Sequence, residues 1–193
     1  MTVHVTDFAR SAILVADEQD NHVAAREALL DAAFGADRRA KTSERLREGR
    51  LPADGLALVA TMADRLVGTV RLWNVTLGPG RPALLLGPIA VDPALQAAGI
   101  GGRLMREALA RAEAQGHRAV ILVGDEPYYR RFGFSTAKLD RLWLPGPLDR
   151  RRFLGLELAA GALDGVGGLV GATGRDAPRW SGWDIASEAR IAA

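Results

Sequence analysis

A glycine-rich segment in the middle of the chain combines residue types that can bind an anion. It follows an apolar run and precedes a stretch with helical periodicity, and its residues are Gln96, Ala97, Ala98, Gly99, Ile100, Gly101, Gly102 and Arg103. Glycines remove side chains where backbone N–H groups could approach an anion closely. The first turn of a helix adds unpaired donors and a partial positive charge. Such a segment suits a pyrophosphate, although the same glycines could serve only a tight strand-to-helix turn.

Two other phosphate-binding motifs fit this segment poorly. A Walker A loop ends in Gly-Lys-Ser/Thr, whereas Gly101 and Gly102 are followed here by Arg103. A dinucleotide-binding loop needs a third glycine three residues after the second, and that position holds Leu104. Neither motif therefore describes the segment.

The stretch Gln96–Gly101 resembles the Q/R-x-x-G-x-G/A loop of the GNAT superfamily, the acyl-CoA-dependent N-acetyltransferases. Two further features occur in the order that this family has them. The strand-like run 84–91 leads into Asp92-Pro93 upstream, and Tyr128-Tyr129-Arg-Arg-Phe-Gly-Phe134 downstream is similar to the family's tyrosine-containing helix ending in Gly-Phe. The resemblance covers roughly residues 14–134. It implies an α/β, GNAT-like fold, with a mixed, splayed central sheet of about six or seven strands flanked by about four helices.

The resemblance also implies that acetyl-CoA is the cosubstrate and that no metal takes part. Amides of the glycine-rich loop would hold the CoA pyrophosphate. The backbone of Ile89, Ala90 and Val91 would bind the pantetheine arm, which acts like an added strand. Pro88 fits this placement, because a proline inside a strand is tolerated only at an edge or a bulge.

Two groups would then act on the acetyl carbonyl and the leaving sulfur. By resemblance, the amide of Ile89 is the oxyanion donor. Tyr129 lies four residues before Gly133 and matches the family tyrosine that protonates the leaving thiolate. Tyr129 could also be a packing aromatic, and Gly87-Pro88 could simply bend a strand. We expect Tyr128 to line the acceptor pocket or to pack.

The general base is the part of the site that the sequence leaves open. Asp125 and Glu126 follow an apolar strand, but a carboxylate before Pro127 is more simply a helix N-cap. His117 follows a helix-ending glycine at the opposite end of its strand, so we expect it at the surface. The three histidines lie far apart in the sequence, and we expect no zinc site.

Features outside these motifs have simple readings. The run Arg150–Arg152 could attract an acidic acceptor or the 3′-phosphate of CoA, although short arginine runs usually form a solvated surface. Trp180 and Trp183 could frame an acceptor cavity or a subunit contact, and we expect them to pack the tail. The stretch 142–161, with Leu-Pro-Gly-Pro, is similar to a bacterial GNAT subgroup whose C-terminal strands complete the acceptor side.

Hydrophobic periodicity predicts the elements that position these residues. Strands are expected at residues 12–16, 56–62, 66–75, 82–91 and 119–123, with shorter pieces near 141–144, 153–158 and 168–172. Helices are expected at 21–34, 38–50, 102–115 and around 127–132. The second of these is charged and should face solvent. Asp64 marks a hairpin turn, Asp20 or Asn21 an N-cap, and Gly116 a C-terminal cap.

Composition sets the limits for the whole chain. The 193 residues are 48% hydrophobic and 25% charged, which is typical of one globular domain. The net charge of only +2 argues against nucleic acid as the main partner. No cysteine is present, so thiolate nucleophiles, cysteine-ligated metals and disulfides are excluded. With no stretch long enough for a membrane span or a signal sequence, we expect a cytoplasmic protein.

We therefore expect a single GNAT-like domain at 1–174, with a tail at 175–193 packed on or near it. The expected reaction is direct acetyl transfer to a primary amine of a small molecule or peptide. Rival readings are a longer acyl-CoA donor, a degenerate acyl-CoA-binding sensor and a pure interaction protein. Dimers are common among proteins that look like this one, so a homodimer is an open expectation.

Overall fold

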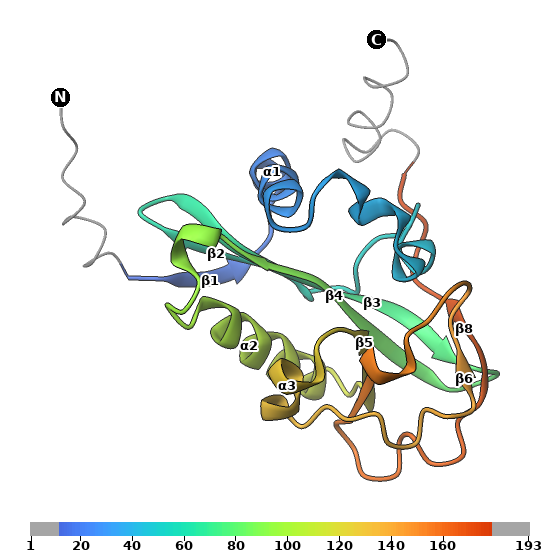
Figure 1. The fold of residues 1–193 in the computed structure, drawn as a ribbon. Helices are drawn as coiled ribbons and strands as arrows, with labels where there is room; N and C mark the ends of the chain where they lie inside the picture. The colour runs from blue at the N-terminus through green and yellow to red at the C-terminus, as the bar shows by residue number, and fades with distance from the viewer. Residues whose placement is uncertain (1–11, 179–193) are drawn as a thin grey trace, which may run out of the picture.

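The computed structural model describes residues 12–178. They form an eight-stranded mixed sheet with helices on both faces (Figure 1). The strands are β1 (Leu14–Asp17), β2 (Ala57–Met62), β3 (Arg65–Leu77), β4 (Pro82–Val91), β5 (Ala119–Val123), β6 (Leu142–Trp143), β7 (Phe153–Glu157) and β8 (Gly168–Ala172). The α-helices are α1 (Val23–Phe34), α2 (Ile100–Ala114) and α3 (Glu126–Tyr129). Short 3₁₀ turns occupy Asp20–His22, Ala36–Ala40, Thr42–Leu46, Pro93–Leu95, Arg130–Phe132 and Arg150–Arg152.

The strand order places β4 and β5 side by side in the middle of the sheet. The order is β1-β2-β3-β4-β5-β7, while β8 pairs with β3 and β6. Most neighbours are antiparallel, but β4 and β5 are parallel and pair only at Leu84 with Val120 and Leu85 with Ile121. Beyond these pairs β4 continues to Val91, so the carboxyl ends of the two strands diverge.

The predicted hairpin at the start of the sheet is confirmed. β2 and β3 are antiparallel, and the turn residues Ala63 and Asp64 both have positive φ, at 47° and 59°. Two consecutive positive φ angles are those of a type I′ turn, whose twist matches that of the flanking strands.

Helix α2 covers one face of the sheet through a row of small and branched apolar residues. Leu104, Met105, Ala108 and Ala112 are fully buried, at the three- and four-residue spacing of a helix. Gly68 of β3 permits this close approach, because a β-carbon there would lie 2.9 Å from Leu104 Cδ1. Helix α2 ends just before Gly116, whose φ of 81° is the left-handed conformation expected of a glycine at a C-terminal cap. The buried apolar surface of α2 thus fixes the glycine-rich loop that precedes it.

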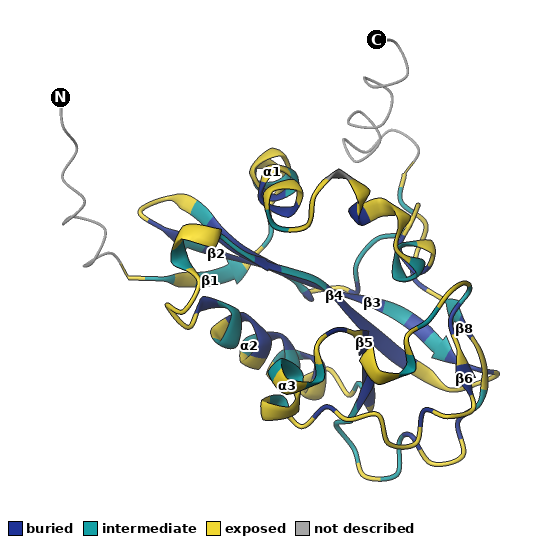
Figure 2. Ribbon diagram, viewed as in Figure 1, coloured by how far each residue is buried: buried dark blue, intermediate teal, exposed yellow. Residues whose placement is uncertain are grey.

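The opposite face is divided between α1 and the C-terminal segments. Alternation along β4 turns Leu84 and Leu86 toward α2 and Leu85 toward the other layer, where Phe153 and Val170 also lie. Figure 2 shows the central strands buried between these layers, with exposed residues on the outer sides of the helices.

The expectation of a solvent-facing helix at 38–50 is wrong. Lys41 is extended, with φ of −67° and ψ of 141°, and it divides the segment into two 3₁₀ turns. Besides Leu46, the buried side chains of this segment are Arg38 and Arg47, so its inner face is polar and has no apolar stripe to hold a long helix.

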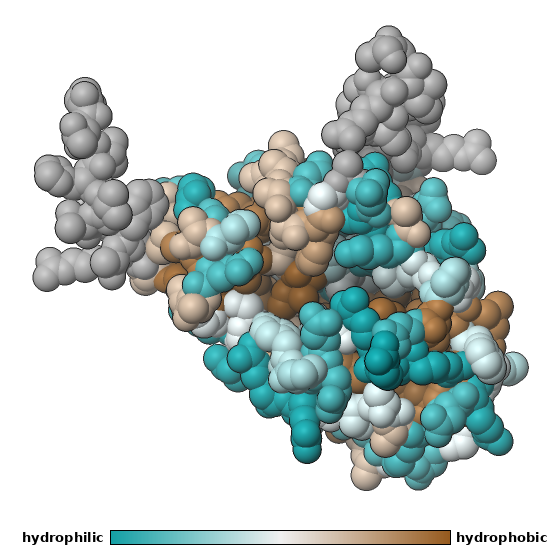
Figure 3. All heavy atoms as spheres, viewed as in Figure 1, coloured by the Kyte–Doolittle hydropathy of each residue, from teal (hydrophilic) through white to brown (hydrophobic). Residues whose placement is uncertain are grey.

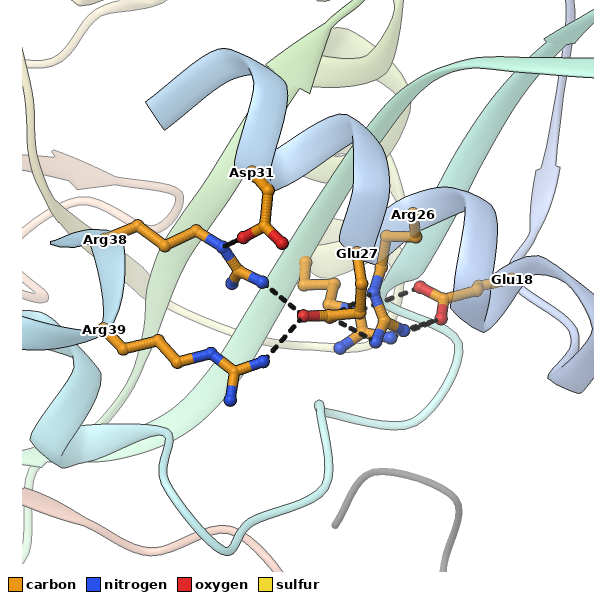
Figure 4. A network of polar contacts seen from close by, with 7 residues as sticks. Glu18, Arg26, Glu27, Asp31, Arg38 and Arg39 are labelled. Carbon is orange, nitrogen blue, oxygen red and sulfur yellow. Dashed lines mark hydrogen bonds and ion pairs between the residues drawn. The ribbon is translucent and has the colours of Figure 1, made fainter. Parts of the chain in front are cut away.

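A network of ion pairs attaches this segment to α1 (Figure 4). Arg38 Nε donates to Asp31 at 2.8 Å and Arg38 Nη2 pairs with Glu27, while Arg39 Nη2 donates to Glu27 at 3.2 Å. Arg26 pairs with both Glu27 and Glu18. Burial works to raise the pKa of Glu27, but hydrogen bonds from Arg26 and Arg38 hold that pKa below its ordinary value.

The predicted mixed α/β sheet is confirmed, with eight strands where about six or seven were expected and three α-helices within residues 12–178 where about four were expected. The predicted helix at 21–34 begins with a 3₁₀ turn, and His22 rather than Asp20 or Asn21 is the N-cap residue of α1. At the start of the expected tail, the Arg175 carbonyl accepts a hydrogen bond from the Leu51 amide, and the Ala177 amide donates one to the Gly49 carbonyl. Trp180 and Trp183 lie outside the described residues.

Candidate active site

A cavity of about 190 Å³ opens where β4 and β5 diverge. Residues of four parts of the chain line it: Phe34 of α1; Arg38, Lys41, Ser43, Glu44 and Arg47 of the following turns; Leu86, Gly87, Pro88 and Ile89 of β4; and Val123, Gly124, Asp125, Tyr129 and Arg152. Figure 3 shows hydrophobic residues in the middle of this face, below α1 and beside a hydrophilic region. The cavity therefore has an apolar floor on β4 and a charged wall.

The floor contains the strand bulge that the proline predicts. Val70 of β3 pairs with Ile89 and Leu72 pairs with Leu86, so Gly87 and Pro88 face a single residue of β3. The Gly87-Pro88 peptide is cis. The buried indole of Trp73 donates to the Gly87 carbonyl at 2.6 Å, which fixes the bulge from below. Ile89 directly follows this bulge and lines the cavity.

The glycine-rich loop leads from β4 into the first turn of α2. Gly99 is the N-cap residue, with φ of 76° and no capping side chain, and the first turn has no acidic residue. The amides of the first helical turn have no partner within the helix. Nothing lies within 4 Å of where a Gly99 β-carbon would be, so this end of the helix is open. The guanidinium of Arg106 lies about one turn further along, 3.4 Å from the corresponding position on Gly102.

Tyr129 lies at the end of α3 and lines the cavity opposite β4. Its ring meets Tyr128 edge to face, with centroids 4.9 Å apart, and also Phe134. Gly124 permits this position, since a β-carbon there would lie 2.2 Å from the Tyr129 ring. Burial, with smaller effects of Tyr128 and Asp125, raises the pKa of the Tyr129 phenol to about 12. The phenol is therefore protonated at physiological pH.

Tyr128 does not line the cavity. Its hydroxyl lies 2.8 Å from the position of a β-carbon on Gly101, at the start of α2, and Arg131 stacks on its ring at 4.0 Å. Of the two expectations for Tyr128, packing is the one that the structure supports.

Two carboxylates line the cavity, one expected and one missed by the sequence. Asp125 is the N-cap residue of α3 as predicted, but its side chain makes no capping bond and instead pairs with Arg152 at 3.2 Å. Glu44, from the turn Thr42–Leu46, pairs with Arg47 at 2.9 Å. Glu126 and His117 are not lining residues. Burial lowers the pKa of His117, which precedes β5 at the end away from the cavity, as expected.

The charged wall has an excess of positive charge. Its cations are Arg38, Lys41, Arg47 and Arg152, against the carboxylates of Glu44 and Asp125. Arg47 is the most buried of these four cations, because only 7% of its side chain is exposed. Burial lowers the pKa of Arg47, and the nearby Glu44 carboxylate opposes that change. Because the ordinary pKa of arginine lies far above neutral pH, Arg47 stays charged.

The arginine run 150–152 divides its three side chains among different surroundings. Arg152 reaches the cavity, Arg150 stacks on Trp143 at 4.0 Å, and the exposed Arg151 pairs with Asp149. Only one of the three thus belongs to the candidate site.

The Leu-Pro-Gly-Pro segment holds the charged wall in place. Thr42 Oγ1 donates to the Pro147 carbonyl and Arg45 Nη1 to the Pro145 carbonyl, both at 2.7 Å. These bonds join residues about a hundred positions apart in the chain, so no local sequence pattern indicates that residues 38–47 form part of the site.

The described part of the chain lacks two kinds of feature. No helix within residues 12–178 is long and apolar enough to cross a membrane. In the same range no three His, Asp or Glu side chains lie together in a group that could hold a metal ion.

Comparison with known proteins identifies the family. Residues 16–137 match the family described as "Acetyltransferase (GNAT) domain". The N-acetyltransferase YhbS of Escherichia coli (strain K12) is 35% identical over 149 residues, which are 75% of this chain and 86% of that protein. Mycothiol acetyltransferase of Rhodococcus jostii (strain RHA1) is 34% identical over 151 residues, or 67% of this chain and 47% of that protein.

Solved structures agree with this result. The crystal structure of YhbS from Escherichia coli in complex with CoA has a TM-score of 0.72 and 32% identity, covering 84% of this chain and 91% of that one. A GNAT family acetyltransferase from Brucella melitensis in complex with acetyl-CoA has a TM-score of 0.58 and 28% identity, with 88% and 93% coverage. On the family match, the identity to YhbS and the shared fold, the chain belongs to the GNAT family of N-acetyltransferases.

Proposed function

We propose that the protein transfers an acetyl group from acetyl-CoA directly to a primary amine while both substrates are bound. The observation that carries this proposal is the divergence of β4 from β5 immediately beside the Gly87-Pro88 bulge, with Tyr129 on the facing side. Two similar proteins, YhbS and the Brucella melitensis enzyme, were crystallised with CoA and acetyl-CoA respectively. The whole chain is then one such domain with a short C-terminal tail.

The glycine-rich loop fits the CoA pyrophosphate. The open first turn of α2 offers unpaired amides, and residues Gln96 to Arg103 present no carboxylate that would repel an anion. The amides of Gly99, Ile100, Gly101 and Gly102 would bind the phosphate oxygens, with the side chains of Gln96 and Arg103 at the edge.

The unpaired edge of β4 fits the pantetheine arm. Beyond Leu85 this edge of β4 has left β5. Ala90 pairs with Thr69 of β3, so the backbone groups of its neighbours Ile89 and Val91 are the ones available to an extended ligand. The acyl end would then lie at Ile89, where the cavity begins. The amide of Ile89 is positioned by the bulge to donate to the acetyl oxygen as charge develops there.

Transfer requires three proton movements. The amine nitrogen attacks the carbonyl carbon as a free base, the C–N bond forms and the C–S bond breaks with its electron pair on sulfur. Tyr129, kept protonated by burial, gives the sulfur its proton, and the proton that the acetylated nitrogen then releases restores the phenol. Glu44 and Asp125 are the lining carboxylates that can take the proton of the incoming ammonium. The chain has no cysteine, so no acyl-thioester of the protein forms.

The test is release of free CoA thiol from acetyl-CoA in the presence of a panel of amines, with the acetylated product identified by mass spectrometry. Tyr129→Phe should lower kcat by about 10²–10⁴-fold, the usual contribution of a general acid, and leave acetyl-CoA binding intact. Tyr128→Phe is the matched control and should keep kcat within a few fold.

Because the Tyr129 phenol has a pKa of about 12, it keeps its proton over the range in which amines lose theirs. The wild-type kcat/KM should therefore rise with pH as the acceptor deprotonates, and should not fall again below about pH 10. Binding of acetyl-CoA without thiol release for any amine would contradict the proposal and favour an acyl-CoA sensor.

A further inference from the structure

Arg47 is a buried cation aimed at the place where the acceptor must enter. Its side chain is only 7% exposed, yet it lines the cavity. Nη1 lies 3.8 Å from the position that a β-carbon on Gly87 would occupy, directly above the β4 bulge. The guanidinium thus lies at the floor of the cavity and not at its rim.

The contacts of Arg47 use one side of its guanidinium. Nε donates to the Ser43 carbonyl at 3.2 Å, and Nη2 donates to Ser43 Oγ at 3.1 Å and pairs with Glu44 at 2.9 Å. These bonds leave the Nη1 group directed to the cavity. A guanidinium has five N–H donors in a planar fork, which suits carboxylate and phosphate oxygens.

Of the other lining charges, Arg38 pairs with Glu27 and Asp31, and Arg152 pairs with Asp125. Lys41 lies over the Phe34 ring at 4.7 Å, at the same wall. Lys41 and Arg47 therefore present the positive charge that faces an incoming acceptor, with the Glu44 carboxylate beside Arg47. Two cations against one carboxylate disfavour a polyamine and favour an acceptor with negative charge.

We infer that the acceptor amine also carries an anionic group, a carboxylate or a phosphate, which Arg47 binds beside the reacting nitrogen. The inference rests on the proposed acetyl transfer at Ile89. Gly87 is two residues before Ile89 in the same bulged stretch of β4, so the anionic group and the acetyl carbonyl would lie close together. The two groups therefore belong to one small molecule or one residue, such as an amino acid, an amino phosphate or the end of a peptide.

Matched pairs of amines test the inference. The probes are glycine, β-alanine and γ-aminobutyrate, each against its carboxamide, together with phosphoethanolamine against ethanolamine. Thiol release from acetyl-CoA is the readout. For at least one pair the wild type should show a kcat/KM at least about tenfold higher for the anionic member.

Arg47→Gln should raise KM for that anionic amine about ten- to a hundredfold more than KM for its neutral partner, as expected for loss of a charged hydrogen bond. The readout is the ratio of the two KM values, because the loss of the Arg47–Glu44 pair can change kcat for both amines. Arg151→Gln removes the same charge from an exposed side chain outside the cavity lining and should keep the preference. If Arg47→Gln does not fold, as judged by the thermal shift with acetyl-CoA, Arg47→Lys replaces it, and a smaller rise in KM for anionic amines only is expected.

Three results would overturn the inference. Neutral amines used as well as their anionic partners in all four pairs would do so and leave the proposed acetyl transfer standing. An Arg47 variant that lowers kcat equally for both members of a pair would show a structural role. Absence of thiol release with every amine would overturn the proposed function and this inference with it.

Discussion

Glu44 and Asp125 differ in exposure, and this difference predicts which of them acts as the base. The Glu44 side chain is 28% exposed and that of Asp125 is 77% exposed. A proton acceptor shielded from bulk water interacts more strongly with an ammonium beside it. Glu44, on the floor side of the wall next to Arg47, is therefore the better candidate.

Glu44→Gln should lower kcat by about 10²-fold or more near neutral pH, and Asp125→Asn should lower it less. The loss in Glu44→Gln should shrink as pH rises, because the acceptor then loses its proton to solvent. The measurement is kcat against pH for both variants. Equal losses, or a larger loss in Asp125→Asn, would contradict this assignment.

The cavity wall depends on elements that meet it from elsewhere in the sequence. Residues 36–47 have little regular structure of their own and are held by α1 through Glu27 and by the Leu-Pro-Gly-Pro segment. The stability of this wall should thus depend on the charge of Glu27.

Glu27→Gln should lower the free energy of unfolding by about 1.5–3 kcal/mol at pH 7, the range for hydrogen bonds to a charged group. The folded pKa of Glu27 lies below the ordinary value of 4.5, so the folded state binds fewer protons than the unfolded state. Its contribution is present above pH 4.5 and is lost as pH falls through the folded pKa. The difference between wild type and variant should accordingly shrink below pH 4.5.

Denaturant titrations at several pH values check this prediction. Asp37→Asn removes an exposed carboxylate from the same stretch and is the matched control, with little effect expected at any pH. A Glu27→Gln difference that stays constant down to about pH 3.5 would contradict the predicted ionisation.

At the level of elements, sequence patterns were informative where a pattern is local. The hairpin turn at Ala63-Asp64, the strand Pro82–Val91 and helix α2 follow from short-range alternation or periodicity. The segment 36–47 does not, because its buried arginines, Arg38 and Arg47, are matched by carboxylates of α1 and of the turn Thr42–Leu46. No local pattern shows that a charged side chain will be buried.

The site divides in the same way. The glycine-rich loop, the bulge at Gly87-Pro88 and Tyr129 lie on elements that a motif identifies. Arg47 and Glu44 reach the cavity only through the packing of residues 42–46 on the Leu-Pro-Gly-Pro segment, a contact across about a hundred residues. The donor side was therefore predictable from the sequence, and the acceptor side was not.

For the molecule as a whole, the splayed sheet places the bulge and Tyr129 around one gap, and the glycine-rich loop lies outside the cavity lining, beside Tyr128. The three parts come from β4, the start of α2 and α3, which the parallel β4–β5 pairing brings together at the carboxyl ends of the strands. The central claim is that acetyl-CoA occupies this gap with its pyrophosphate on the loop.

The most direct test is the dissociation constant of acetyl-CoA, measured by calorimetry for wild type, Gly99→Glu and Gly80→Glu. Both glycines have positive φ, 76° and 69°, and nothing within 4 Å of an added β-carbon, so the substitutions impose similar backbone strain. Only Gly99→Glu places a carboxylate at the loop, where it should repel the pyrophosphate. The account predicts binding by wild type and Gly80→Glu and its loss in Gly99→Glu; absence of binding to wild type, or equal binding by all three, would contradict it.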